Sequence, residues 1–250
     1  MVNTELIIFV HIAKTGGTTL RGVLDKQYGS DSLFMYTHKT IESLSNKEQI
    51  LTTLQNHITN VKAISGHFAF GMKYAEIDEP LLPLIQIGRK ITYVSMIRRP
   101  VDRIFSLYHH YKRNNWLHSE LTFKNFITHK LYDLNHQTHY ISGTLAPNLD
   151  IAKTNIMNHF ALVGVTDMYK ESLFLMKKRF NWTNFKYDKL GVFVKPSLIP
   201  DIPNKLIESI NNDNHLDLEL YKFTRKLLKK KIKLLSKSQR KELRYFSPFY

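Results

Sequence analysis

A short apolar segment that runs into a lysine and a glycine pair constrains the fold of this chain most. Residues 6–12 are mostly apolar and β-branched, and they lead into "HIAKTGGTTL", in which Lys14 stands before Gly16 and Gly17. Apolar runs of this kind that end at glycines are typical of buried strands. Apolar side chains then recur at helical spacing over residues 18–28. The sequence therefore predicts a strand, a tight loop and a helix in succession.

Further strands and helices alternate along the chain. Strands are expected at residues 61–65, 91–97 and 160–165, and helices at residues 41–58, 101–112 and 168–179. Strands that alternate with helices favour an α/β fold, in which helices cover both faces of a central parallel sheet. No repeat, low-complexity linker or composition break precedes about residue 212. We therefore expect a single domain over residues 1–250.

The chain is basic, and most of the excess charge lies near its C-terminus. Its 36 Lys and Arg against 21 Asp and Glu give a net charge of +15, and residues 221–250 hold eleven of these cations against Glu242 alone. A helix or tail at about residues 215–250 is expected to dock on the domain and leave its lysines in solvent. Contact with an anionic membrane, or recruitment of an acidic acceptor, is the alternative. The apolar face of this segment carries Leu216, Leu220, Phe223, Leu227 and Leu234.

Cysteine is absent from the sequence, which excludes disulfides, thiolate nucleophiles and cysteine-bound zinc. The apolar opening is too short for a signal peptide, and no apolar run reaches the ~20 residues that span a bilayer. We expect a soluble, cytoplasmic protein.

The residues of the loop with Lys14 and the glycine pair are suited to binding an anion. Backbone N–H groups at a strand–loop–helix junction form a cradle for anions, and the helix dipole favours negative charge there. Lys14 adds a mobile positive charge, and hydroxyls are added by Thr15, Thr18 and Thr19. The nucleoside-triphosphate loop GxxxxGK[ST] has its lysine after the glycines, so the order here is different. A tight turn with a helix cap is the alternative interpretation.

Two other strand ends carry candidate functional residues. Arg98 follows the strand at 91–97, and Ser106 lies two helical turns later, so the pair suits a second phosphate. The alternative is that Arg98 and Arg99 are solvated, with Asp102 and Arg103 in surface ion pairs. His67, in "SGHFAFG", could take a proton from an attacking hydroxyl. A structural histidine is the alternative there.

The order of five motifs resembles that of the heparan sulfate 2-O-sulfotransferase-like family, in a soluble bacterial form. The motifs are "HIAKTGGTTL", "GHFAFG", "IRRPVDRIFSLYHHY", "NHQTHYISG" and "FALVGVTDMYKESLFLMKK", over about residues 6–225. The resemblance implies a P-loop-like three-layer sandwich and the co-substrate 3′-phosphoadenosine 5′-phosphosulfate (PAPS), without a metal. It implies that His67 is the catalytic base, that Arg98 and Ser106 bind the 3′-phosphate, and that Lys195 in "FVKPSL" helps to close over the nucleotide. The loop that binds the 5′-phosphosulfate comprises Lys14, Thr15, Gly16, Gly17 and Thr18, with Thr19 beside it.

Some positions depart from the family pattern. Ala13 replaces a usual proline, Arg99 replaces the aspartate of "RDP", and His139 stands where many relatives have an arginine that contacts the acceptor. The "FVKPSL" segment also lacks a histidine and an arginine often found there.

The sequence therefore predicts sulfuryl transfer from PAPS to a hydroxyl acceptor, with a glycan as the first choice and a peptide tyrosine as the alternative. His67 would remove the acceptor proton, and Lys14 would stabilise the leaving oxygen. A P-loop nucleotide kinase would need a lysine after the glycines and a magnesium-binding carboxylate. A non-enzymatic polyanion- or nucleic-acid-binding protein would rest on the basic tail alone, and nucleic acid is not the expected partner.

Overall fold

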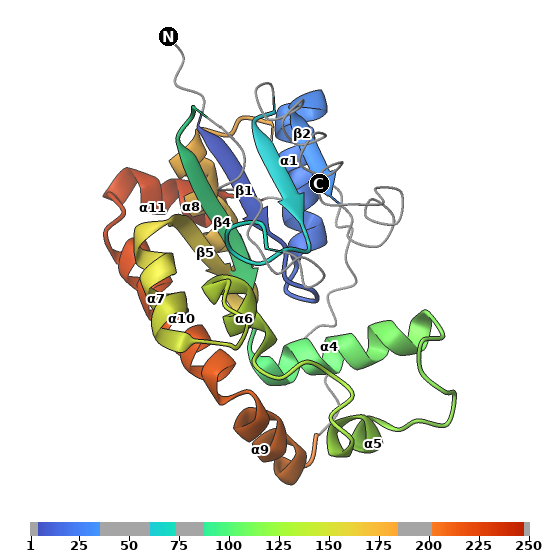
Figure 1. Ribbon diagram of the computed structural model, residues 1–250. Coiled ribbons are helices and arrows are strands. Elements are labelled where there is room, and N and C mark those ends of the chain that lie inside the picture. Colours follow the sequence, from blue (N-terminus) through green and yellow to red (C-terminus); the bar gives the residue numbers. More distant parts are fainter. Residues whose placement is uncertain (1–4, 36–60, 74–87, 185–201, 248–250) are drawn as a thin grey trace.

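The computed structural model describes residues 5–35, 61–73, 88–184 and 202–247. Within them, five parallel strands form one central sheet in the order β2-β3-β1-β4-β5 (Figure 1). The strands are β1 (Leu6–Val10), β2 (Ser32–Met35), β3 (Ala63–Gly66), β4 (Ile91–Ile97) and β5 (Phe160–Val165).

The strand register brings the ends of neighbouring strands to one edge of the sheet. Val10 pairs with Gly66 of β3 on one side and with Ser95 of β4 on the other. Every residue of β1 is buried, as expected for a central strand of a parallel sheet covered on both faces. The segments that follow β1, β3 and β4 therefore start side by side, at the edge where ligands bind in open α/β sheets.

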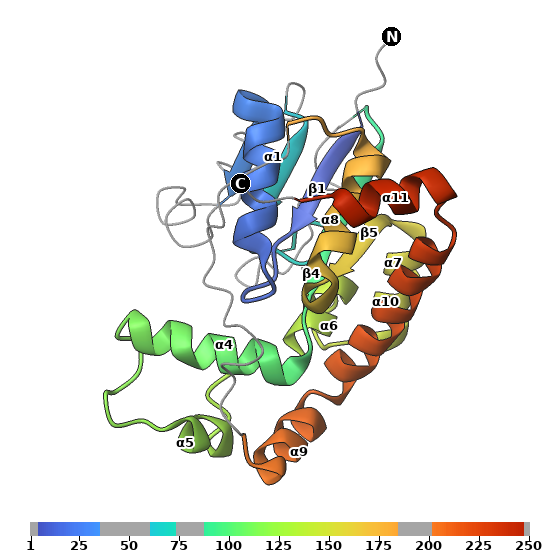
Figure 2. The same cartoon turned by 180° about the vertical axis from the view of Figure 1, so that it is seen from behind.

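Helices cover both faces of the sheet, so the predicted α/β sandwich is confirmed. The helices α1 (Gly17–Tyr28) and α8 (Tyr169–Phe180) lie on one face, which is nearer the viewer in Figure 2. The helices α6 (His136–Ser142) and α7 (Leu149–Asn158) lie on the other. The long helix α10 (His215–Lys233) packs along β5 and contacts both α7 and α8.

A second group of helices lies beyond the carboxyl ends of the strands, at the bottom of Figure 1. It comprises α4 (Pro100–Arg113), α5 (Phe123–Thr128) and α9 (Asn204–Asp213). Apolar side chains from these helices and the connection after α5 form a cluster of their own: Val101, Ile104, Leu107, Tyr108, Phe126, Ile127, Tyr132 and Ile210. Within the group, α4 begins directly after β4. The last helix, α11 (Lys237–Tyr245), packs back toward α8 through the Lys177–Glu242 ion pair.

Most of the predicted elements are present. The strands expected at 91–97 and 160–165 are found at those residues, whereas the first strand ends at Val10, before the loop begins. The sequence missed the edge strand β2, and the helix expected at 41–58 lies outside the described residues. The placement of Leu234 on the buried face of the C-terminal helix was wrong. It caps the C-terminus of α10 and is 76% exposed, because the helix ends one residue earlier.

Candidate functional site

The loop between β1 and α1 has the backbone geometry of an anion cradle. Lys14 has φ +67° and Gly16 has φ +86°, so two residues of this short loop are left-handed. Such turns gather backbone N–H groups on one side. Gly16 is also the cap of α1 and brings no side chain to accept from the first helical N–H groups. These amides remain available to an anion, which the helix dipole would also attract.

The carbonyl side of the loop is tied to the protein. The Thr15 hydroxyl donates to the Ile12 carbonyl at 2.9 Å. The Thr166 hydroxyl donates to the Thr15 carbonyl at 2.9 Å, and the Tyr169 hydroxyl donates to the Gly16 carbonyl at 3.0 Å. What Thr15 offers a ligand is therefore its backbone N–H, because its hydroxyl is buried and already donates. Of the other two threonines predicted to donate hydroxyls, Thr18 is exposed and Thr19 is buried.

A stack of imidazole rings joins the loop to His67. The His11 ring lies 4.3 Å from the His67 ring, centroid to centroid, at an interplanar angle of 26°, and stacks on Phe9 on β1 at 5.1 Å. A Cβ on Gly17 would lie 2.0 Å from His11 Cδ2, so only glycine leaves room for this ring at the start of α1. His11 is 6% exposed, and burial, with the charges of His67, Arg21 and Lys14, lowers its pKa well below the ordinary value.

Arg98 reaches the loop from the end of β4. Its Nη1 donates to the Lys14 carbonyl at 3.4 Å. The Gln137 side chain holds the backbone of Arg98 on both sides, because it accepts from the Arg98 N–H at 2.7 Å and donates to the Arg98 carbonyl at 2.9 Å. Burial lowers the pKa of Arg98. The guanidinium is thus fixed at the site by α6 as well as by its own strand.

A buried carboxylate fixes Gln137 in turn. Asp217, on α10, is 1% exposed and accepts from the backbone N–H groups of Gln137 at 3.1 Å and Thr138 at 2.7 Å. It also accepts from the Thr138 hydroxyl at 2.8 Å. A carboxylate at the start of a helix satisfies its free N–H groups and opposes the helix dipole. The chain of contacts from Asp217 through Gln137 therefore supports Arg98 from behind.

The charges of two arginines act on Lys14. The pKa of Lys14 is lowered to about 8, because the amine is partly buried and because Arg113 and Arg98 are close to it. Arg113 is exposed at the end of α4, whereas Arg98 comes from the end of β4. In the part of the chain that the structure describes, no ion pair joins Lys14, Arg98 or Arg113 to a carboxylate. Among the described residues, the carboxylate that acts on Arg98 is Asp102, which forms its ion pair with Arg99.

The alternative interpretation of the segment after β4, with solvated arginines and surface ion pairs, holds only in part. Arg99 is exposed and pairs with Asp102 at 2.7 Å, as that interpretation expected. Arg103 is 2% exposed, so its placement in a surface ion pair was wrong. The periodicity of α4 turns Arg103 inward, where Asp217 and Asp133 act on its guanidinium.

The other predicted site residues are Ser106, His139 and Lys195. Ser106 is half-buried on α4, and among the described residues no hydrogen bond joins it to Lys14 or Arg98. His139 lies on α6, two residues after Gln137. Lys195 lies outside the described residues.

Sequence reasoning missed several residues that build the site. Thr166 and Tyr169 could have been found, because they follow the strand β5 as Lys14 follows β1 and Arg98 follows β4. Arg113 and Gln137 carry no local signal, since each acts across a tertiary contact. Groups of three or more His, Cys, Asp or Glu that could hold a metal do not occur among the described residues, and no helix there is long and apolar enough to cross a membrane.

Comparison with known proteins finds distant structural likeness only. No family model matches the chain, and no curated protein matches it. A sulfotransferase from Alicyclobacillus acidocaldarius superposes with a TM-score of 0.49 at 13% identity, over 94% of this chain and 98% of that one. A mouse sulfotransferase complexed with PAP gives 0.43 at 17% identity, over 84% of this chain and 63% of that one. A retinol dehydratase in complex with androsterone and inactive cofactor PAP gives 0.37 at 13% identity, over 89% and 66%. Likeness at this level carries no functional argument, so the function has to be argued from the residues of the site.

Proposed function

We propose that this chain is a sulfotransferase that moves the sulfuryl group of PAPS to an acceptor hydroxyl. The observation that carries the proposal is the contact of Arg98 with the Lys14 carbonyl, at a loop with left-handed residues where Gly16 gives α1 no side-chain cap. Burial first, and then the charges of Arg113 and Arg98, disfavour the charged form of the Lys14 amine and lower its pKa to about 8. A ligand with several negative charges would stabilise the charged amine.

The groups that could bind an anion come from two neighbouring strand ends, which suits a donor with two anionic groups. The loop follows β1, whereas Arg98 follows the neighbouring strand β4. A nucleotide with a 5′-phosphosulfate and a 3′-phosphate would place one anionic group at each. The motif resemblance implies the same division, with Ser106 beside the 3′-phosphate. A donor held in this way uses the lysine that precedes the glycines, which the nucleoside-triphosphate loop does not have.

His67 and Lys14 would carry out the transfer from adjacent strand ends. His67 would accept the proton of the acceptor hydroxyl while the hydroxyl oxygen forms its bond to sulfur. The bond between sulfur and the bridging oxygen of the 5′-phosphate breaks in the same displacement, and Lys14 would stabilise the charge on that oxygen. The products are a sulfate ester and adenosine 3′,5′-bisphosphate (PAP), and the proton remains on His67.

His11 would act as a positioning residue for His67. Its ring stacks on Phe9 and lies close against Gly17, where a side chain would not fit. Its backbone N–H donates to the Gly66 carbonyl at 2.9 Å. Because the His67 ring stacks on this fixed ring, its plane is set relative to the loop that would hold the donor.

For the acceptor, the proposal names a chemical class and not a single molecule. A glycan hydroxyl is the first choice by the motif resemblance, and a peptide tyrosine is the alternative. His139, where many relatives have arginine, lies on the helix that supports Arg98 and is the residue to vary when acceptors are compared. The closing role of Lys195 stays a prediction.

Calorimetric titration with PAP tests the proposal. We expect PAP to bind without magnesium and at least about tenfold more tightly than ADP, because ADP carries both phosphates at one end of the nucleoside. Absence of PAP binding, or equal affinity for ADP, would refute the donor assignment. With binding established, transfer of labelled sulfate from PAPS to a panel of glycans and tyrosine peptides would identify the acceptor class.

A further inference from the structure

The outward face of α10 carries a dense row of cationic side chains. We call this set the basic face: Lys222, Arg225, Lys226, Lys229, Lys230 and Lys233. We propose that the basic face is a docking surface for a linear polyanion, namely the sulfated stretch of a polymeric product.

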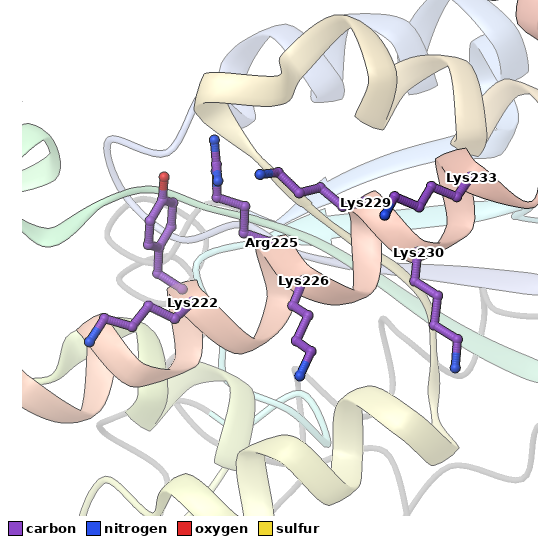
Figure 3. A pocket seen from close by; sticks show the side chains of 7 residues that line it. Lys222, Arg225, Lys226, Lys229, Lys230 and Lys233 are labelled. Atoms are coloured by element: carbon purple, nitrogen blue, oxygen red, sulfur yellow. The ribbon is translucent and has the colours of Figure 1, made fainter.

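The basic face is continuous because of its spacing. Its members are three or one residues apart, which keeps them on one side of a helix over about 16 Å. Figure 3 views α10 from this side, with Arg225 and Lys229 along one margin of the basic face and Lys226 and Lys230 along the other. With Tyr221 these side chains line an open hollow of about 570 Å³. The opposite side of α10 holds the helix on the protein through its buried residues, Asp217, Leu220, Thr224 and Leu228.

Much of this charge has no counter-charge among the residues that the structure describes. Lys222 pairs with Glu219 and Arg225 pairs with Asp167, at the N-terminal end of the basic face. In the described part of the chain, no carboxylate pairs with the four lysines that complete it, Lys226, Lys229, Lys230 and Lys233. The carbonyls at the end of α10 do not need them either, because Arg240 donates to the Lys233 carbonyl at 2.7 Å and to the Leu235 carbonyl at 3.0 Å.

The charge density selects the kind of partner. The four lysines without a carboxylate partner span about 10 Å, or one charge about every 3 Å, close to the ~3.4 Å between phosphates along one strand of DNA. A chain molecule with closely spaced anionic groups therefore matches this part of the basic face. Lysine ammonium groups act as mobile point charges and tolerate irregular spacing, which suits a polymer that is not uniformly charged.

The composition of the basic face argues against other polyanionic partners. Proteins that hold single-stranded nucleic acid combine basic grooves with aromatic side chains on which bases stack. Here the aromatic residue is Tyr221, which is half-buried, with a pKa raised to about 12 by burial and by Asp167. Helices that lie in a bilayer surface present large apolar residues between their cations, and none lines this hollow. An acidic polymer without bases or acyl chains fits better.

The basic face starts beside the proposed donor site. Arg225 pairs with Asp167 at 3.0 Å, and the preceding residue, Thr166, donates to the carbonyl of Thr15 in the anion-binding loop. A polymer that gains sulfate at His67 could thus extend onto α10 without leaving the protein. This part of the inference rests on the proposed function, because it supplies the sulfated product. A basic face that holds the product would make successive transfers to one chain faster than transfers to new chains.

Binding of dextran sulfate, measured by fluorescence anisotropy over a range of salt, tests the docking surface directly. The test variant is Lys226→Gln/Lys229→Gln/Lys230→Gln. The matched control, Lys124→Gln/Lys237→Gln/Lys241→Gln, removes the same charge from exposed positions on α5 and α11. We expect the test variant to bind at least about tenfold more weakly, with a salt slope smaller by about 2, and the control to change less than about twofold.

The other outcomes separate the possibilities. Equal losses in both variants would show that net charge, and not the basic face, causes binding, and would overturn the inference. Tighter binding of a thymidine oligonucleotide or of phosphatidylserine vesicles through the same lysines would overturn the choice of partner. PAP titration of the test variant distinguishes this inference from the proposed function. We expect its PAP affinity to equal that of the unmodified chain, whereas failure of both to bind PAP would refute the donor assignment and leave the dextran sulfate result standing.

Discussion

The loop after β1 and the basic face of α10 are both strongly positive, yet they are built in opposite ways. At the loop, Lys14 and Arg98 come from two segments and meet at one partly buried place, and the charge of the exposed Arg113 acts on Lys14 from the end of α4. On α10, six cations come from consecutive turns of one helix and spread into solvent (Figure 3). The loop concentrates charge at a point, whereas the basic face distributes it along a line.

This difference determines what each region can select. Buried or half-buried charges interact strongly with a ligand at close range and are little affected by salt. Exposed charges are screened and bind almost any polyanion of suitable spacing. The loop is therefore suited to one small donor with a defined arrangement of charges, and α10 to a long partner that need not have a single structure.

The largest expected effect separates chemistry from binding within the site. His67→Ala should lower kcat for sulfuryl transfer by about 10²–10⁴-fold, because a positioned general base contributes that much. PAP affinity should stay within about twofold, since the histidine acts on the acceptor side. Steady-state kinetics and calorimetry of the variant measure the two quantities. Near-normal kcat would remove His67 from the mechanism.

A smaller effect is expected where Arg98 binds the donor. Arg98→Ala should weaken PAP binding by about 10–100-fold, as expected for charge-assisted hydrogen bonds worth roughly 1.5–3 kcal/mol. Lys229→Gln, which removes one charge from the basic face, is the matched control and should leave PAP affinity unchanged. If both variants lose affinity equally, the contrast between the two basic regions fails.

A third prediction concerns the ring that supports His67. His11→Ala should lower kcat by about tenfold, because the base loses its fixed orientation while PAP binding is kept. His11→Phe keeps a flat ring in the stack and should recover most of the rate. A thermal melt of each variant shows whether stability accounts for the loss. Recovery of stability without recovery of kcat would contradict the positioning role.

The smallest expected effect is a dependence on pH. The pKa of Lys14 is about 8 without ligand, so the amine loses its proton as the pH rises through 8. A bound anion favours the charged amine and raises that pKa, so PAP binding near pH 8.5 should take up a proton, and affinity should fall from pH 7 to 9. Calorimetry in two buffers of different ionisation enthalpy measures the uptake. Lys14→Arg should abolish it, because arginine stays charged.

The sequence predicted the parts of the site that are local. The strand, the glycine pair and the following helix lie within one continuous segment, and the residues after β3 and β4 could be placed because parallel strands end at one edge. The contacts that hold the site together could not be predicted. Asp217 acts on Gln137 across 80 positions in the chain, and His11 meets His67 only because β1 and β3 are neighbours in the sheet.

Arg113 shows a further limit of sequence reasoning. It appears as one more cation at the end of an amphipathic helix, and only the direction of α4 relative to the sheet brings it to Lys14. The same holds for Arg103, whose burial depends on the packing of α4 against Asp217 and Asp133. Single-domain organisation, the cytoplasmic location and the role of Lys195 remain predictions.

A crystal structure of the chain with PAP tests the central claim most directly. We expect one phosphate within about 3 Å of the Lys14 amine and the N–H groups of the loop, and the other within hydrogen-bond distance of the Arg98 guanidinium. PAP bound along α10, or bound with neither phosphate at the loop, would contradict the assignment of Lys14 and Arg98 to the donor.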